Sequence, residues 1–475
     1  MSELRYDEWM NESDSVLWHI ERDPLLRSTI TSVWFLDSMP DRARMDAVVE
    51  RTVAAIPRLR QRVVDEQPGI ATPRWVDDPH VDVGYHYSWA RLPARHVGRS
   101  DVFEFAQRMG ARSFDKDRPL WELCVIDGLP GKKAAFVMKI HHAIADGLGM
   151  VQLLQYMVDL EADPAGDAEP FVGDPAVAGR FRIVAPLWGI PGARSITHRI
   201  VSEARTGARL GRASLRTATD LMRDPRGTIE QLGRTTGSIA RVVKPATTPL
   251  SPLMTGRSLN TNFDAIAIPF RDFKTAAAAA GGTLNDAFVA TTLDALLRYH
   301  DASGVPCDQV RMNMPVSVRG GEASNQFDNQ FVPARTVLPL NRLDAAGRIA
   351  EVRGLLHDVR AEPALPHVND ISGVIGRLGP AAAVSVLGAM LKGVDITTSN
   401  VPGPSFPVFM AGSKIDEFFA FGPLAGAAIN ITLFSYDGRV HLGVNTDRAA
   451  VVNRELFMQC LTEAVAATME LTTPA

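Results

Sequence analysis

The chain of 475 residues is 46% hydrophobic and 22% charged, an ordinary globular composition, and it is too long for one hydrophobic core, so we expect two domains. A net charge of −4 argues against a protein dedicated to binding nucleic acid. The three cysteines, Cys124, Cys307 and Cys460, lie far apart, which argues against a disulfide framework or a cysteine zinc site and fits a reducing cytoplasmic setting.

The N-terminal segment MSELRYDEWMNESD is polar and acidic, so it does not have the pattern of a signal peptide. No stretch reaches the roughly 18 uninterrupted apolar residues that a membrane-spanning helix needs. We therefore expect no integral membrane anchor.

The first half of the chain mixes helical and strand patterns. Residues 44–64 show the apolar spacing of a helix, which Pro57 ends before a second short turn. Residues 113–129 predict a loop, a strand and a turn, and 132–142 predict the neighbouring strand. Residues 146–163 predict a helix with Asp146 as its N-cap. The apolar stripe of that helix consists of Met150, Leu153, Leu154 and Met157.

A basic segment separates the two halves. Between positions 194 and 244, eleven basic and four acidic residues give a charge of +7. The simpler interpretation is a solvated connector of helices. The sharper one is a contact surface for anionic lipid headgroups or for the phosphates of a nucleotide cofactor.

Helices and strands also alternate in the second half, which starts near Ser258, so we expect an α/β fold. Residues 281–300 predict a turn and then a helix that begins near Thr283 or Asn285. Residues 427–448 predict a hairpin that turns at Asp437-Gly438, a dipeptide favoured in type I′ turns. The other predicted elements are the strands 309–319, 331–340 and 395–404 and the closing helix 453–471.

The segment KIHHAIADGLG (139–149) is the strongest candidate for chemistry. His141 and His142 end an apolar strand, and side chains alternate along a strand, so one histidine can pack while the other faces a cavity. A metal site would need a third ligand and converging geometry, which this pair does not offer. A single imidazole with a pKa near ~6.5 suits a general base. Asp146 would then cap the helix or pair with an arginine, and Gly147 would allow a tight turn.

The pattern HHxxxDG resembles the motif of the CoA-dependent acyltransferase superfamily. Further segments are similar, in order, to those of bacterial wax ester synthase/diacylglycerol acyltransferases, and the resemblance extends from about residue 6 to 470. These segments are RPLW (118–121), LNDAFVA (284–290), PVSVR (315–319), SNVPGP (399–404) and NITLFSYDGRV (430–440).

The resemblance implies two chloramphenicol-acetyltransferase-like subdomains joined by a helical connector, with an active-site tunnel between them. We expect an N-terminal subdomain at 1–180, the basic connector at 181–257 and a C-terminal subdomain at 258–475.

The resemblance also implies roles for individual residues. His142 would be the general base in the middle of the tunnel, with His141 supporting it. Asp146 would be structural or orienting, and Gly147 would form the turn. The residues expected to support the site from the second half are Asn285, Asp286 and Ser399, of which Asn285 or Ser399 would donate to the oxyanion.

The implied activity is transfer of a long-chain acyl group from acyl-CoA, the co-substrate, to diacylglycerol, to long-chain alcohols or to both. We expect no bound cofactor and no metal. Because a lipid substrate has to be extracted, we expect peripheral attachment to the inner face of the membrane or to lipid bodies. The sequence leaves open the preferred alcohol, the acyl length and the oligomeric state.

Two alternatives remain. One is a stand-alone condensation-type domain that uses carrier-bound substrates, although the PLW and NVPGP segments argue against it. The other is a non-catalytic lipid-binding protein of the same fold, which the intact HHAIADG argues against.

Overall fold

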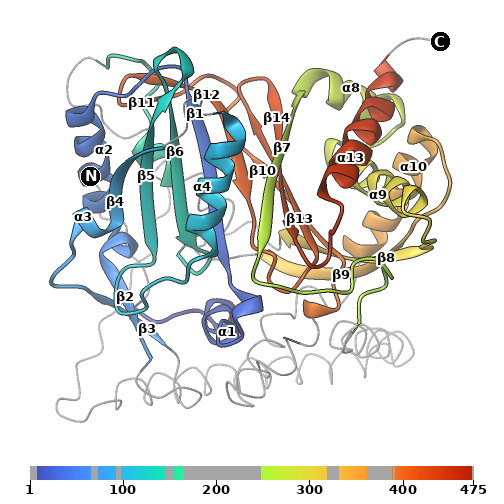
Figure 1. The fold of residues 1–475 in the computed structure, drawn as a ribbon, viewed down its shortest axis with the longest axis horizontal. Helices are drawn as coiled ribbons and strands as arrows, with labels where there is room; N and C mark the ends of the chain where they lie inside the picture. The colour runs from blue at the N-terminus through green and yellow to red at the C-terminus, as the bar shows by residue number, and fades with distance from the viewer. Residues whose placement is uncertain are drawn as a thin grey trace, which may run out of the picture.

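Two six-stranded sheets stand side by side in the computed structural model of the chain (Figure 1). The structure describes residues 8–65, 73–92, 98–144, 153–164, 248–317, 331–360, 388 and 391–472. The predicted α/β fold with two sheet-containing halves is confirmed. Most of the predicted connector lies outside the described residues, and the division at 180 and 257 and the tunnel stay predictions.

The first sheet has the strand order β11-β12-β1-β6-β5-β4. Its strands are β1 (Thr29–Leu36), β4 (Tyr87–Arg91), β5 (Trp121–Leu129), β6 (Lys133–His141), β11 (Phe409–Met410) and β12 (Ser413–Phe421). The strand β1 lies in the interior of the sheet and pairs antiparallel with both β6 and β12. The second half of the chain therefore supplies two strands to the first sheet.

Among the described residues, the helices that accompany this sheet include α1 (Glu12–Ile20), α2 (Arg42–Ala55), α3 (Val83–His86) and α4 (Arg99–Ala111), and residues 153–157 are also helical. A separate two-stranded ribbon is formed by β2 (Gln61–Val64) and β3 (Arg74–Asp77). The strand β6 is buried on both faces: Phe136 and Met138 belong to one core cluster and Ala135 and Val137 to another. This explains the nearly continuous apolar run that precedes the two histidines.

The second sheet has the strand order β7-β14-β13-β10-β8-β9. Its strands are β7 (Thr261–Pro269), β8 (Gln309–Ser317), β9 (Phe331–Pro339), β10 (Ile396–Pro402), β13 (Ile429–Tyr436) and β14 (Arg439–Asp447). The predicted hairpin is confirmed, since Asp437 and Gly438 between β13 and β14 have φ angles of 42° and 75°, both positive as a type I′ turn requires.

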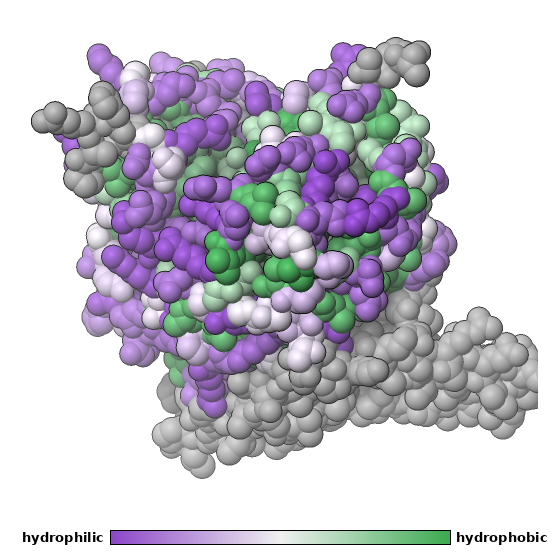
Figure 2. All heavy atoms as spheres, turned by 45° about the vertical axis from the view of Figure 1, so that its right-hand side comes forward, coloured by the Kyte–Doolittle hydropathy of each residue, from purple (hydrophilic) through white to green (hydrophobic). Residues whose placement is uncertain are grey.

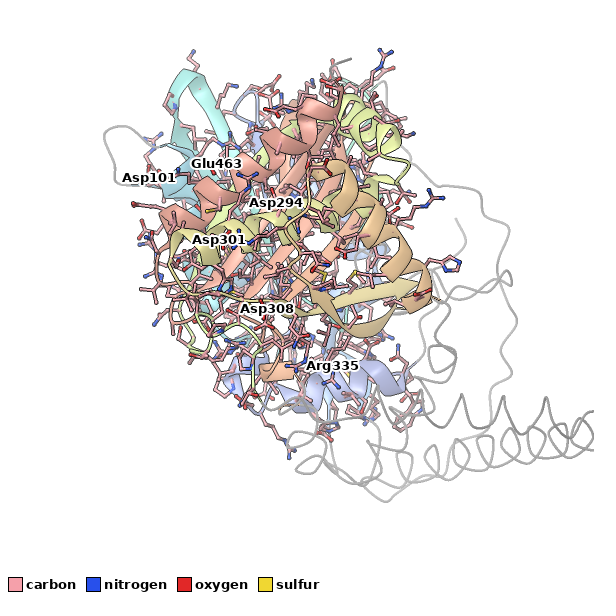
Figure 3. All side chains as sticks on the ribbon, turned by 90° about the vertical axis from the view of Figure 1, so that its right-hand side faces the viewer. Asp101, Asp294, Asp301, Asp308, Arg335 and Glu463 are labelled. Carbon is pink, nitrogen blue, oxygen red and sulfur yellow. The ribbon has the colours of Figure 1, made fainter. Side chains whose placement is uncertain are left out.

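Helices α8 (Phe270–Ala279), α9 (Leu284–Ala302), α10 (Ala345–Arg360) and α13 (Arg454–Met469) form a layer on the outer side of the second sheet (Figure 1). Charged residues link three of them. Asp294 of α9 contacts Arg298 at 2.8 Å and the buried Arg348 of α10 at 3.3 Å, and Arg298 also approaches Glu463 of α13 at 3.7 Å. Asp294 and Glu463 are labelled in Figure 3. On the face shown in Figure 2, polar side chains divide the apolar ones into small areas.

The two halves meet where β12 crosses β13 and β14, with α4 between the sheets. Gly443 of β14 allows a close approach, because a Cβ there would lie 2.0 Å from the carbonyl oxygen of Ala420. The rings of Phe263 and Phe421 stack at 4.1 Å across the same contact. Close packing at this junction therefore fixes how the two sheets sit against each other.

Candidate active site

His141 is a packed residue. It is 1% exposed at the end of β6, and its Nδ1 accepts the backbone N–H of Ala143 at 3.0 Å. Its Nε2 lies 3.0 Å from Oε1 of Glu21, within ion-pair distance, although this buried nitrogen makes no hydrogen bond of regular geometry. Both ring nitrogens face protein groups, so His141 has a structural position.

His142 is half-buried, one residue beyond the strand, and its backbone N–H donates to the carbonyl of Ser28 at 2.8 Å. The chain turns here, since the N–H of Ile144 returns to the carbonyl of His141 at 2.9 Å. His142 is thus more exposed than His141, while the cavity that the second histidine was expected to face stays a prediction. Asp146 and Gly147 lie outside the described residues.

Glu21, which no sequence pattern singles out, is the buried carboxylate beside this turn. Its Oε1 accepts the N–H of Ser28 at 2.7 Å, and its Oε2 lies 3.6 Å from Nζ of Lys116. Burial raises the pKa of the Glu21 carboxyl, but His141, Ser28 and Lys116 together lower it to about 2. The sequence HIERDP gives no local sign that this glutamate is buried.

The RPLW segment anchors the strand before the histidines. The carbonyl of Leu120 accepts the N–H of His141 at 3.0 Å, and the indole N–H of Trp121 donates to the carbonyl of Leu59 at 2.8 Å. The ring of His86 stacks on Trp121 at 4.5 Å. Leu120 and Trp121 are fully or almost fully buried, so this part of the motif packs in the core.

The second-half candidates gather at the start of α9 and on β10. Thr283 and Asp286 form a reciprocal capping box, with hydrogen bonds of 2.8 and 3.2 Å, so Asp286 is a buried helix-capping residue. The amide oxygen of Asn285 accepts from Asn400 at 3.2 Å, which brings it beside the segment that contains the half-buried Ser399. Their roles toward an oxyanion stay predictions.

Cys124 is a small buried side chain. It is 2% exposed on β5, and burial raises the pKa of its thiol. A thiolate nucleophile at this position is therefore disfavoured.

Two protein-family models match the chain. The wax ester synthase/diacylglycerol acyltransferase catalytic domain matches residues 10–288, and the WS/DGAT C-terminal domain matches residues 327–468. Two proteins of Mycobacterium tuberculosis (strain H37Rv), each named as a putative diacylglycerol O-acyltransferase, are similar in sequence. One is 32% identical over 96% of this chain and 91% of its own length, and the other 28% identical over 85% and 84%.

Solved structures share the fold. The wax ester synthase/diacylglycerol acyltransferase from Marinobacter aquaeolei VT8 is 20% identical with a TM-score of 0.59, covering 98% of this chain and 99% of that one. The first condensation domain of the calcium-dependent antibiotic synthetase is 17% identical with a TM-score of 0.60, covering 98% and 96%.

These comparisons and the two-sheet architecture define an acyltransferase with the mixed α/β fold that condensation domains also have. The chain belongs to the wax ester synthase/diacylglycerol acyltransferase family. Within the part of the chain that the structure describes, no helix combines the length and apolarity needed to cross a membrane.

Proposed function

We propose that the protein is an acyl-CoA-dependent O-acyltransferase that transfers a long-chain acyl group to diacylglycerol, with His142 as the general base. The observation that carries the proposal is the placement of the two histidines in a chain of this family: His141 is buried, held at Nδ1 and beside Glu21 at Nε2, whereas the half-buried His142 is anchored by its backbone. The names of the similar Mycobacterium proteins support diacylglycerol as the acceptor.

In the proposed reaction, His142 takes the proton of the acceptor hydroxyl, and the hydroxyl oxygen attacks the thioester carbonyl carbon. The tetrahedral oxyanion needs a hydrogen-bond donor, for which Asn285 and Ser399 are the candidates. The C–S bond then breaks, coenzyme A leaves, and the imidazolium returns its proton to the sulfur. Since no acyl-enzyme forms, acyl-CoA and the alcohol have to be bound together.

The test is ester formation from labelled acyl-CoA with dioleoylglycerol or hexadecanol by purified protein. We expect His142→Ala to lower kcat by about 10²- to 10⁴-fold, the usual contribution of a general base. The matched control is His80→Ala, which removes an exposed histidine and leaves the rate unchanged. If His142→Ala forms as much ester as the wild type, His142 is not the base.

The same assay identifies the preferred acceptor alcohol and distinguishes the proposed activity from the alternative enzyme classes. Ester from hexadecanol alone would make the protein a wax ester synthase, and release of free thiol without ester would indicate a thioesterase. Activity only with carrier-bound acyl groups would favour a condensation-type enzyme. We also propose peripheral membrane attachment, which sedimentation with phospholipid vesicles would test.

A further inference from the structure

We propose that Glu21 is a positioning residue for His142, an inference that rests on the proposed function. Glu21 follows α1 and lies far from the histidines in the sequence, yet its carboxylate reaches the turn that carries them. It touches His141 and the backbone of Ser28 rather than the reacting atoms, so its effect on His142 is indirect.

The first connection runs through the backbone. Oε1 of Glu21 accepts the N–H of Ser28 at 2.7 Å, and the carbonyl of the same residue accepts the N–H of His142 at 2.8 Å. Ser28 is 1% exposed, so solvent does not compete for either bond. The position of the His142 backbone therefore depends on the carboxylate through one intervening residue.

The second connection runs through His141. The N–H of Ala143 occupies Nδ1, so the other ring nitrogen, Nε2, is the one beside Glu21, with 3.0 Å between Nε2 and Oε1. The other neighbours of this imidazole include the rings of Trp18 and Phe114, with centroids 6.2 and 6.1 Å away. Without the carboxylate, the buried Nε2 of His141 would lose this charged neighbour, and only the bond at Nδ1 would hold the ring.

The segment that carries Glu21 and Ser28 is itself anchored on the second half. Asp23 pairs with Lys392, and the fully buried Leu26 packs so closely that a Cβ at Gly426 would lie 3.0 Å from its side chain. These two contacts hold the segment between Glu21 and Ser28 against the second half and so support the position of Glu21.

The test compares Glu21→Leu, which removes both contacts, with Glu21→Gln, which keeps an acceptor oxygen at the same reach. We expect Glu21→Leu to lower kcat by about 10²-fold with less than about a threefold change in the KM for acyl-CoA, and Glu21→Gln to restore most of the rate. In the His142→Ala background, Glu21→Leu should lower the residual rate no further, because both changes act on the same group.

Amide hydrogen exchange, measured by mass spectrometry, tests the same backbone hydrogen bonds independently of enzyme activity. We expect the amides of Ser28, His142 and Ala143 to exchange faster in Glu21→Leu than in the wild type. The matched control is Asp65→Leu, which breaks another carboxylate–histidine contact, to His19 at 3.2 Å, and should leave these amides and kcat unchanged.

The outcomes separate the two proposals. Loss of kcat in Glu21→Leu together with faster exchange supports the positioning role. Unchanged exchange, or a wild-type kcat in a protein whose His142→Ala variant is inactive, overturns it. A fully active His142→Ala variant instead overturns the proposed base, and the exchange data then still decide whether Glu21 holds the turn.

Discussion

At the scale of single residues, the two histidines show how far a sequence pattern reaches. Alternation along a strand predicts that His141 and His142 have different surroundings, and it does so from adjacent residues alone. The partner that fixes His141 is Glu21, which lies on a different element and is brought close only by tertiary packing. No local spacing could have identified it, so this part of the site could not be predicted.

The lowered pKa of Glu21 makes a prediction about stability. Its pKa is about 2 in the folded protein against 4.5 for the ordinary carboxyl, so its contribution is complete above pH 4.5 and is lost as the pH falls toward 2. We expect Glu21→Gln to be less stable than the wild type by about 3 kcal/mol at pH 7, and the difference to shrink below pH 4.5.

Urea denaturation at pH 7, 5 and 3 would measure this difference. The control is Glu104→Gln, which removes an exposed carboxylate paired with Arg108 and should change stability by less than about 1 kcal/mol at each pH. A gap between Glu21→Gln and the wild type that stays constant from pH 7 to 3 would contradict the assigned pKa.

At the scale of elements, the capping box at the start of α9 gives a further prediction. Thr283→Ala removes the side-chain acceptor for the N–H of Asp286, and such a change typically costs about 1 kcal/mol. The shift in urea midpoint measures the loss. Thr275→Ala is the control, because its hydroxyl bonds to a carbonyl within α8 and caps no terminus. Equal midpoints for the two variants would show that the box does not stabilise α9.

Elements whose signals are local were predicted well. The hairpin at Asp437-Gly438 and the helix beginning at Thr283 follow from turn and capping residues a few positions apart. The pairing of β12 with β1 was not predicted, because the sequence of a single strand does not show which distant strand it pairs with. The fold class could therefore be predicted from the sequence, whereas the composition of the first sheet could not.

At the scale of the whole molecule, His441 makes the stability of the contact between the two halves depend on pH. It is fully buried on β14, with its ring centroid 5.1 Å from that of Phe419 on β12. Burial, with smaller effects of Arg439 and Arg99, lowers its pKa to about 4 from the ordinary 6.5. The unfolded chain therefore takes up this proton first, and stability falls as the pH drops from 6.5 to 4.

The wild type should lose up to about 3 kcal/mol of unfolding free energy through His441 as the pH falls from 6.5 to 4, and we expect His441→Phe to abolish this loss. A phenyl ring fits among the same aromatic neighbours and binds no proton. Urea midpoints between pH 7 and 4.5 would measure it. His357→Phe, at an exposed position, is the control. If the wild type and His441→Phe lose stability in parallel over this range, His441 does not carry the effect.

The crossing of β12 into the first sheet also has a consequence for biosynthesis. The strand β1 acquires one neighbour as soon as β6 is made, but its other neighbour is not complete until the ribosome has translated Phe421. An emerging N-terminal part would expose the open edge of β1 throughout most of translation, and such edges promote aggregation. Folding late, or under the protection of a chaperone, is thus built into the topology of this chain.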